Sequence, residues 1–175
     1  MCVSLFKYYR GVHALWPFGH GLSYATWAVT DPDAAAHATA TFAATNASFA
    51  LAFHLDVQRT DACANFQAQL TVTACVRPLD VPGLTATSTP VALKQLVSFV
   101  RTADVYAGGT ASADLSLTAD AFALADAAGD LSVWPGTYRV ELWDGGANAL
   151  VTNVSVTGDA PRLVQPFPKA ATAAA

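Results

Sequence analysis

Side chains that could carry out catalysis or hold a metal are scarce in this sequence. Glu141 is the single glutamate, and it stands beside Arg139 in an alternating stretch. We therefore expect a solvated cross-strand pair there rather than a general acid. No two histidines share the spacing of metal ligands on one strand or helix. The histidines are His13, His20, His37 and His54. We predict no catalytic residue, no metal and no cofactor in this chain.

The most distinctive stretch is residues 16–24, which read Trp-Pro-Phe-Gly-His-Gly-Leu-Ser-Tyr. It begins like a dinucleotide-binding fingerprint, but Tyr24 occupies the place of the third glycine and no strand leads into it. It also falls one residue short of the nucleophile elbow G-x-S-x-G, because Ala25 replaces the last glycine and extended chain follows Ser23. We interpret the stretch as a stiff lead-in to a domain, fixed by Pro17 and by large aromatic anchors.

Composition limits the classes of partner. Of the 175 residues, 53% are apolar and 13% are charged, and the net charge is −4. No basic patch is available to neutralise phosphates, so we expect no nucleic-acid partner. No apolar run reaches the roughly 18 residues of a membrane span, so we expect no membrane partner. Residues 1–7 lack the pattern of a signal peptide.

The three cysteines, Cys2, Cys63 and Cys75, lack the C-x-x-C spacing of a zinc site. A Cys63–Cys75 bridge across a hairpin is conceivable. Unpaired, partly buried thiols are the favoured alternative.

Alternation of apolar and polar residues predicts two long strands. Over 49–57 the odd positions are large and apolar, which is typical of a half-buried strand. Over 66–76 the even positions are apolar, with Leu70 among them. Thr71, Thr73 and Cys75 are then expected on the opposite face.

The rest of the chain continues in short strands. Further strands are predicted over 96–101, 111–117, 138–142 and 150–156. Residues 118–126 are predicted to form a short helix, capped by Thr118 and ending near Gly129. Residues 161–175 read as a loose tail. Regular short strands separated by turns predict an all-β fold built as a β-sandwich.

Residues 17–24 resemble the segment that ends the second catalytic-region domain in glycoside hydrolase family 3. That family contains β-glucosidases and β-xylosidases, and His20 between two glycines is closer to the β-xylosidase-like branch. Residues 8–11, Tyr-Tyr-Arg-Gly, resemble the family's aromatic approach to this motif. A fibronectin type III-like domain follows the motif in the family. The resemblance therefore implies an immunoglobulin/fibronectin type III-like β-sandwich with an N-terminal extended strap.

The resemblance covers most of residues 6–145, and two departures stand out. Residues 59–63, Arg-Thr-Asp-Ala-Cys, take the place of an Asn-x-Gly turn after the first long strand. Trp143 and Asp144 stand where a glycine is usual. Both departures concern the packing of one edge more than the fold.

The resemblance implies three segments. Residues 1–27 would be the end of the catalytic region and a linker strap, residues 28–158 the β-sandwich, and residues 159–175 a flexible tail. The chain has no Ser-Asp pair and starts after the loop that carries the family's acid/base residue. We therefore expect a non-catalytic fragment of a glycosidase that is inactive alone. A start so close to the motif suggests a fragment.

The resemblance also implies partners. The catalytic domains of the parent enzyme would receive a domain-docking motif, and an oligo- or polysaccharide would bind if Trp134 or Trp143 stacks on a sugar. Core or edge packing is the alternative role for both tryptophans. The docking motif would consist of Tyr8, Tyr9, Trp16, Pro17, Phe18, Gly19, His20, Gly21 and Tyr24. A stand-alone carbohydrate-binding or protein-interaction module is the alternative function.

Two sequons bear on localisation. Asn46-Ala47-Ser48 and Asn153-Val154-Ser155 match the N-glycosylation pattern. Together with the resemblance they favour an extracellular, secreted parent, with Asn46 and Asn153 as glycosylation sites.

Overall fold

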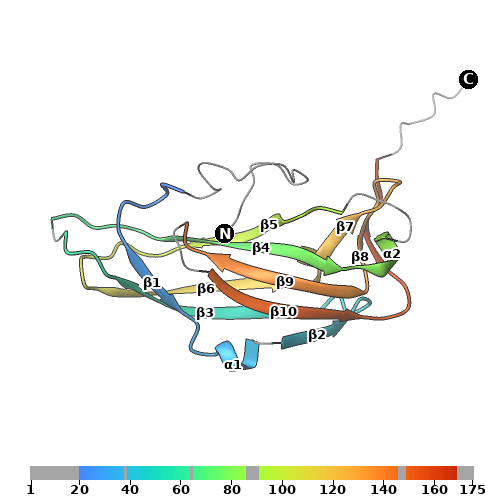
Figure 1. Ribbon diagram of the computed structural model, residues 1–175, viewed down its shortest axis with the longest axis horizontal. Coiled ribbons are helices and arrows are strands. Elements are labelled where there is room, and N and C mark those ends of the chain that lie inside the picture. The colour runs from blue at the N-terminus through green and yellow to red at the C-terminus, as the bar shows by residue number, and fades with distance from the viewer. Residues whose placement is uncertain (1–19, 38, 64, 86–90, 146–148, 169–175) are drawn as a thin grey trace, which may run out of the picture.

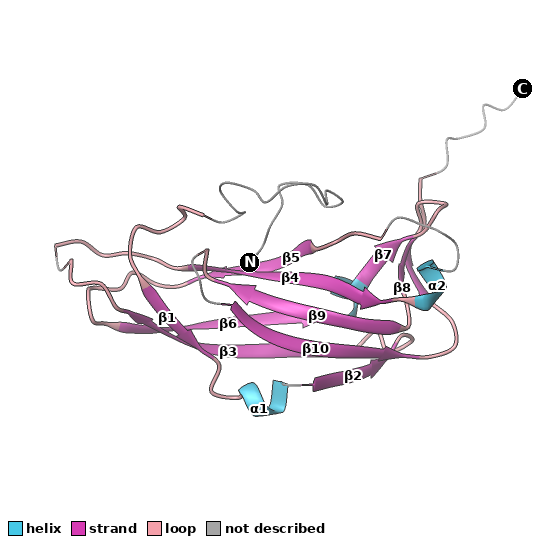
Figure 2. Ribbon diagram, viewed as in Figure 1, coloured by secondary structure: helices cyan, strands magenta, loops and turns pink. Residues whose placement is uncertain are grey.

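The computed structural model describes residues 20–37, 39–63, 65–85, 91–145 and 149–168, and nearly all regular structure in them is β-strand (Figure 2). The all-β prediction is confirmed. In chain order the elements are β1 (Trp27–Thr30), α1 (Ala34–His37), β2 (Thr39–Ala43), β3 (Ala50–Arg59), β4 (Thr71–Asp80), α2 (Pro82–Thr85), β5 (Gln95–Arg101), β6 (Thr110–Thr118), the 3-10 helix η1 (Ala119–Phe122), β7 (Ala123–Ala125), β8 (Leu131–Val133), β9 (Gly136–Trp143), β10 (Ala149–Thr157) and β11 (Arg162–Gln165).

The strands form two main sheets and one small one (Figure 1). A three-stranded sheet has the order β1-β3-β6, and a five-stranded sheet has the order β2-β10-β9-β4-β5. A small sheet, β11-β8-β7, lies at one end. All neighbours are antiparallel except β2 and β10, which run parallel. Side chains from both main sheets form one buried cluster, so the two sheets share a hydrophobic core.

Strand β3 behaves as its alternation predicts. Leu51, Phe53, Leu55 and Val57 are buried in the shared core, and the residues between them are exposed. One face of β3 is covered by the other sheet, whereas its other face meets solvent. Buried and exposed side chains therefore alternate along the strand with a period of two residues. Tyr138, Val140 and Leu142 of β9 likewise share the core face.

Strand β4 differs from the sequence prediction in its first residue and in the burial of its second face. It begins at Thr71 rather than Phe66, and an isolated bridge between Ala68 and Val105 is what joins the preceding segment to its neighbour. Thr71, Thr73 and Cys75 do not face solvent, because they are 8%, 4% and 2% exposed. β4 lies between β9 and β5, and both of its faces are buried over Thr71–Val76. The hydroxyl of Thr73 meets this burial by donating to the carbonyl of Trp143.

Two further segments differ from their predictions. The predicted helix over 118–126 is a single 3-10 turn, η1, followed by the short strand β7. The Thr118 side chain makes no capping hydrogen bond, and Ala119 and Phe122 are buried, so core packing fixes this turn. The predicted loose tail contains β11, which pairs with β8. Phe167 also packs on Gly129, where an added Cβ would lie 2.7 Å from its ring.

Candidate functional site

The polar centre of the described structure lies at the end of β3, where Arg59 continues the inward-facing row of that strand. The guanidinium belongs to a residue with 0% exposure, which is rare for a charged side chain without a partner. Asp61, two residues later, supplies that partner. Arg59 Nε lies 2.8 Å from Asp61 Oδ2, and Arg59 Nη2 lies 2.9 Å from Asp61 Oδ1. This bidentate geometry is the strongest form of an arginine–carboxylate contact.

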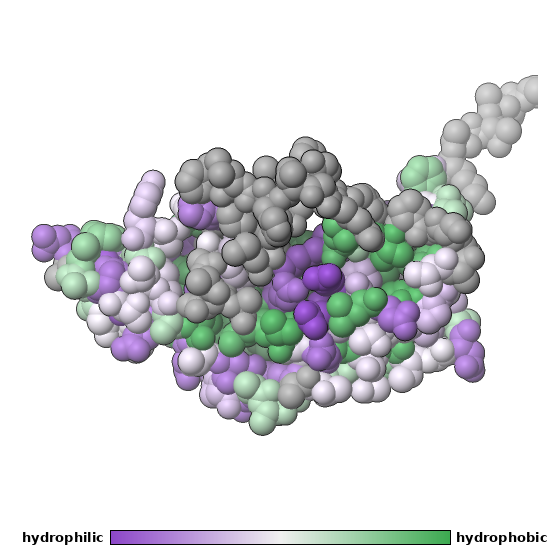
Figure 3. All heavy atoms as spheres, viewed as in Figure 1, coloured by the Kyte–Doolittle hydropathy of each residue, from purple (hydrophilic) through white to green (hydrophobic). Residues whose placement is uncertain are grey.

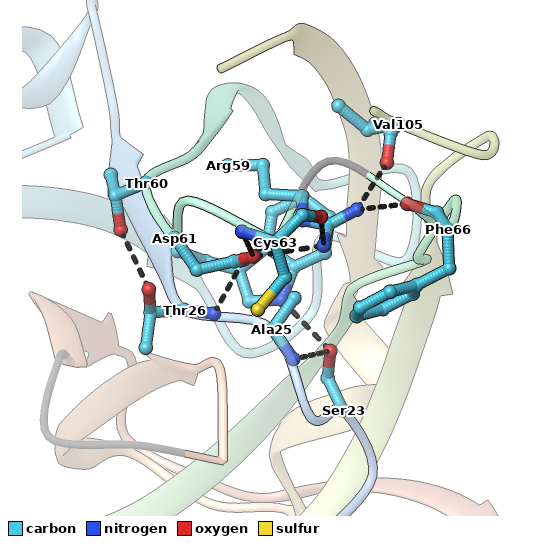
Figure 4. Close-up of polar contacts among 10 residues, drawn as sticks. Ser23, Ala25, Thr26, Arg59, Thr60, Asp61, Cys63, Phe66 and Val105 are labelled. Atoms are coloured by element: carbon cyan, nitrogen blue, oxygen red, sulfur yellow. Dashed lines mark hydrogen bonds and ion pairs between the residues drawn. The ribbon is translucent and has the colours of Figure 1, made fainter. Parts of the chain in front are cut away.

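The remaining donors of Arg59 reach two loops, the one between β3 and β4 and the one between β5 and β6 (Figure 4). Nη1 donates to the carbonyls of Phe66 and Val105, at 2.7 Å and 3.0 Å, and Nη2 donates to the carbonyl of Cys63. The guanidinium also lies 4.3 Å from the centre of the Phe66 ring, in a cation–π contact. Arg59 therefore satisfies carbonyl groups in two loops, and the Val105 carbonyl also accepts from the backbone N–H of Ala68.

Asp61 extends this network to the chain that leads into β1. Its Oδ2 accepts from the backbone N–H of Thr26 at 3.2 Å, and the backbone N–H of Thr60 donates to the Thr26 carbonyl at 2.9 Å. The hydrogen bond from Arg59 is the main reason that the pKa of Asp61 lies well below its usual range. The ionised carboxylate thus holds both the arginine and the lead-in.

Ser23 fixes the other end of the lead-in. Its Oγ accepts from the indole Nε1 of Trp27 at 2.9 Å and from the backbone N–H of Ala25 at 3.3 Å. Trp27 is itself buried in the core. We name residues 23–27 together with Arg59 and Asp61 the junction site, because they set the path of the chain as it enters the β domain (Figure 4).

Sequence reasoning missed the junction site. It treated residues 59–63 as a departure from an expected turn, and the structure makes them the polar centre of this end of the domain. The signal was present in the alternation, since Arg59 falls on the inward row after Val57 and Asp61 follows two residues later.

The predicted docking motif is only partly within the described residues. His20, Gly21 and Tyr24 are described, and all three are exposed, with Tyr24 at 96%. Gly21 takes a φ of +77°, a conformation that favours glycine. The six other members, Tyr8, Tyr9, Trp16, Pro17, Phe18 and Gly19, lie outside the described residues.

The predicted solvated pair at Glu141 is wrong. Glu141 is 8% exposed rather than solvated, and its partner is Lys94 Nζ, which pairs with Glu141 Oε2. Lys94, directly before β5, reaches Glu141 across β4, so the carboxylate has a partner on a neighbouring strand's lead-in. A carboxylate already neutralised by a lysine is poorly suited to donate a proton to a leaving group.

Neither tryptophan stands free to receive a sugar. Trp143 is 2% exposed and clusters with Cys75, and Trp134 packs partly buried against the shared core. The Trp134 carbonyl accepts a 2.8 Å hydrogen bond from the Tyr138 hydroxyl. Both tryptophan rings therefore contribute to packing, as the alternative role predicts.

A groove of about 420 Å³ lies where the edge strands β5 and β6 approach one another. Its lining residues are Gln95, Leu96, Val97, Ser116, Leu117, Thr118, Asp120, Ala121, Ala123 and Leu131. No aromatic ring is among these described residues, so the groove lacks a platform of the kind that stacks on a sugar.

A histidine–aspartate pair lies outside the junction site. His54 Nδ1 lies 2.6 Å from Asp114 Oδ1 across β3 and β6, and this hydrogen bond raises the pKa of His54. Cys63 is a free, exposed thiol, so the conceivable Cys63–Cys75 bridge does not form, and Cys75 is buried. Within the described ranges no group of three His, Cys, Asp or Glu side chains could hold a metal ion.

Two surface features complete the description. Asn46 and Asn153, the predicted glycosylation sites, are both exposed. None of the helices in the described ranges has the length and apolar character that crossing a bilayer requires.

The all-β fold of this chain recurs as one part of β-glucosidases of known structure. The chain aligns with a β-glucosidase from Listeria innocua, solved in complex with glucose, at a TM-score of 0.61 and 17% identity, over 83% of this chain and 18% of that one. A β-glucosidase from Kluyveromyces marxianus gives a TM-score of 0.60 at 22% identity, over 84% and 16%. A β-glucosidase from Erythrobacter marinus gives 0.61 at 20% identity, over 87% and 18%.

These likenesses define the fold of the chain and leave its activity open, because each identity is below a quarter. The chain spans at most about a fifth of the length of the β-glucosidases it matches. No protein-family model matches the sequence, and no curated protein matches it.

Proposed function

We propose that this chain is the C-terminal, non-catalytic domain of a family 3 glycoside hydrolase of β-xylosidase or β-glucosidase type. The domain would be fibronectin type III-like and would stabilise the catalytic region of its parent. The observation that carries the proposal is the combination of fold and position: most of the chain aligns with one segment of β-glucosidases, and the family-like motif at 17–24 leads directly into β1.

The junction site supports a docking role for the lead-in. Asp61 and Ser23 accept hydrogen bonds from the backbone N–H groups of Thr26 and Ala25, so the backbone between residues 23 and 27 is held in place. Tyr24 is left 96% exposed at this point. A large ring held on a fixed backbone is suited to burial against a partner domain, which we propose is the catalytic region.

The proposal assigns no catalysis to this chain. Its single glutamate is paired with Lys94, and the nucleophile and acid/base of the parent would lie in preceding domains. We propose an extracellular location for that parent, consistent with the exposed sequons at Asn46 and Asn153.

The test starts with the purified full chain and aryl-β-xyloside and aryl-β-glucoside substrates. We expect no turnover above background, and turnover that Glu141→Gln abolished would overturn the proposal. The gene upstream of the Met1 codon should encode a barrel domain that contains a Ser-Asp pair. An unrelated upstream sequence, or none, would favour the stand-alone module instead.

Dye binding tests the docking role separately. The full chain should bind a hydrophobic dye, and deletion of residues 1–18 should reduce that binding while the unfolding transition of the β domain remains. Unchanged dye binding after the deletion would refute the docking role. Saturable binding of xylan or laminarin oligosaccharides by the full chain would favour a carbohydrate-binding module.

A further inference from the structure

The face of the five-stranded sheet that points away from the core carries a pair of arginines. Val76 and Val140 are partners on β4 and β9, and both are buried in the core at 0% exposure. The next residues, Arg77 and Arg139, therefore point to the outer face. They lie directly opposite each other in the register, and Asn153 of β10 lies opposite Arg139 on the other side.

Neither arginine has an acidic partner among the described residues. Glu141, two residues further along β9, is already paired with Lys94. No ion pair joins Arg77 or Arg139 to a carboxylate in the described ranges, and the Nε of Arg139 is buried without a hydrogen-bond acceptor there. Like charges directly opposite on a sheet repel, and a buried N–H without an acceptor is unfavourable. The arrangement therefore lacks an anion.

Apolar side chains border the arginine pair. Val151 lies opposite Glu141 and is 50% exposed, and Leu96 lies opposite Cys75 and is 47% exposed. Figure 3 shows a strongly hydrophilic spot over β4 and β9, bordered by hydrophobic surface. A charged centre with exposed apolar neighbours matches the make-up of protein interfaces, in which arginine is enriched.

We propose that Arg77 and Arg139 bind a carboxylate of an aspartate or glutamate on the surface of a partner protein. A guanidinium presents a planar pair of donors that fits a carboxylate, and Arg77 and Arg139 face each other across β4 and β9. Val151 and Leu96 would be covered by the partner around this contact, which favours a protein surface over a small free anion. The inference does not depend on the proposed glycosidase parent.

The probe for the test is a fluorescein-labelled peptide of alternating glutamate and leucine, with a glutamine–leucine peptide as its control. Fluorescence anisotropy with the full chain should show saturable binding of the glutamate peptide alone. Arg77→Gln and Arg139→Gln should each weaken that binding by about tenfold or more. Arg101→Gln is the matched control, because it removes the same charge from the same sheet at a residue that already donates to Thr71 Oγ1. It should change the binding by less than about twofold.

A second measurement separates binding from folding. Each glutamine variant should unfold at a denaturant midpoint no lower than that of the parent chain, since it removes a like-charge contact. In the unsubstituted chain the Nε–Hε resonance of Arg139 should shift on addition of the glutamate peptide. No saturable binding, equal losses in all three variants, equal binding of the glutamine peptide, or tighter binding of glucuronic acid oligosaccharides would each overturn the proposal.

Discussion

The hydroxyl of Tyr138 gives the sharpest test of the core. Tyr138 is 0% exposed, its ring packs edge-on against Phe122 at a centroid distance of 5.6 Å, and its hydroxyl donates to the Trp134 carbonyl at 2.8 Å. Tyr138→Phe keeps the ring contact and removes the donor. Near neutral pH we expect the free energy of unfolding to fall by about 1–2 kcal/mol, the cost of leaving a partly buried carbonyl without its donor.

The same residue predicts a pH dependence with a definite sign. Burial raises the pKa of Tyr138 well above its ordinary value of 10.0. Below pH about 10 both the folded and the unfolded chain keep the phenolic proton, so the contribution to stability is complete there. Above it the unfolded chain loses the proton while the folded chain keeps it, and stability falls by up to about 1.4 kcal/mol per pH unit.

Urea unfolding of the unsubstituted chain and of Tyr138→Phe between about pH 8 and pH 11.5 measures their difference in stability. The difference is taken from the denaturant midpoints while the dependence of the unfolding free energy on urea stays the same. The advantage of the unsubstituted chain should shrink above about pH 10 and disappear between about pH 10.6 and 11.5. All other titratable groups are common to the two chains, so they cancel in the comparison. Two curves that fall in parallel over this range would refute the buried, proton-retaining state of Tyr138.

Three further outcomes are expected. Leu70→Ala should destabilise the fold by about 2–5 kcal/mol in thermal or urea unfolding. Phe99→Ala, at a ring that is 66% exposed, should cost less than about 0.5 kcal/mol, and equal losses would contradict the assigned burial. Asp61→Asn should speed proteolytic cleavage near residues 20–27, and an unchanged cleavage rate would speak against the junction site. The lowered pKa of Asp61 makes its contribution to stability present above about pH 4 and lost below it. The substitution should therefore flatten the loss of stability as the pH falls below about 4. Secretory expression should add glycan at Asn46 or Asn153, which intact mass would detect, and unmodified secreted protein would contradict the extracellular proposal.

Sequence alternation predicted the strands whose two faces meet different surroundings. β3 has one face in the core and one in solvent, so Leu51 and Phe53 could be placed correctly from the pattern alone. In β4 the same reasoning put Thr73 and Cys75 in solvent, because a threonine or cysteine between core residues reads as polar in either case. Whether the second face of a strand is covered depends on its place in the sheet, which a single stretch of sequence does not contain.

The candidate site shows the same limit. Extending the alternation past Val57 would have put Arg59 on the inward row, yet its role depends on carbonyls of residues 63, 66 and 105, which approach it only in the folded chain. Local propensity also favoured a helix after Thr118, and the burial of Ala119 and Phe122 limits it to one 3-10 turn. Tertiary contacts decided both outcomes.

The parallel pairing of β2 with β10 has a consequence for synthesis. Thr39 lies beside Asn153 and Ala43 lies beside Thr157. The backbone donors and acceptors of β2 therefore stay unpaired by β10 until that strand has been synthesised. On a translating ribosome β2 would remain an open edge until more than a hundred further residues had emerged. Non-local pairing of this kind slows folding and leaves an aggregation-prone edge in the meantime. Chains released before about residue 157 should therefore depend on chaperones and form inclusion bodies more readily than the finished protein.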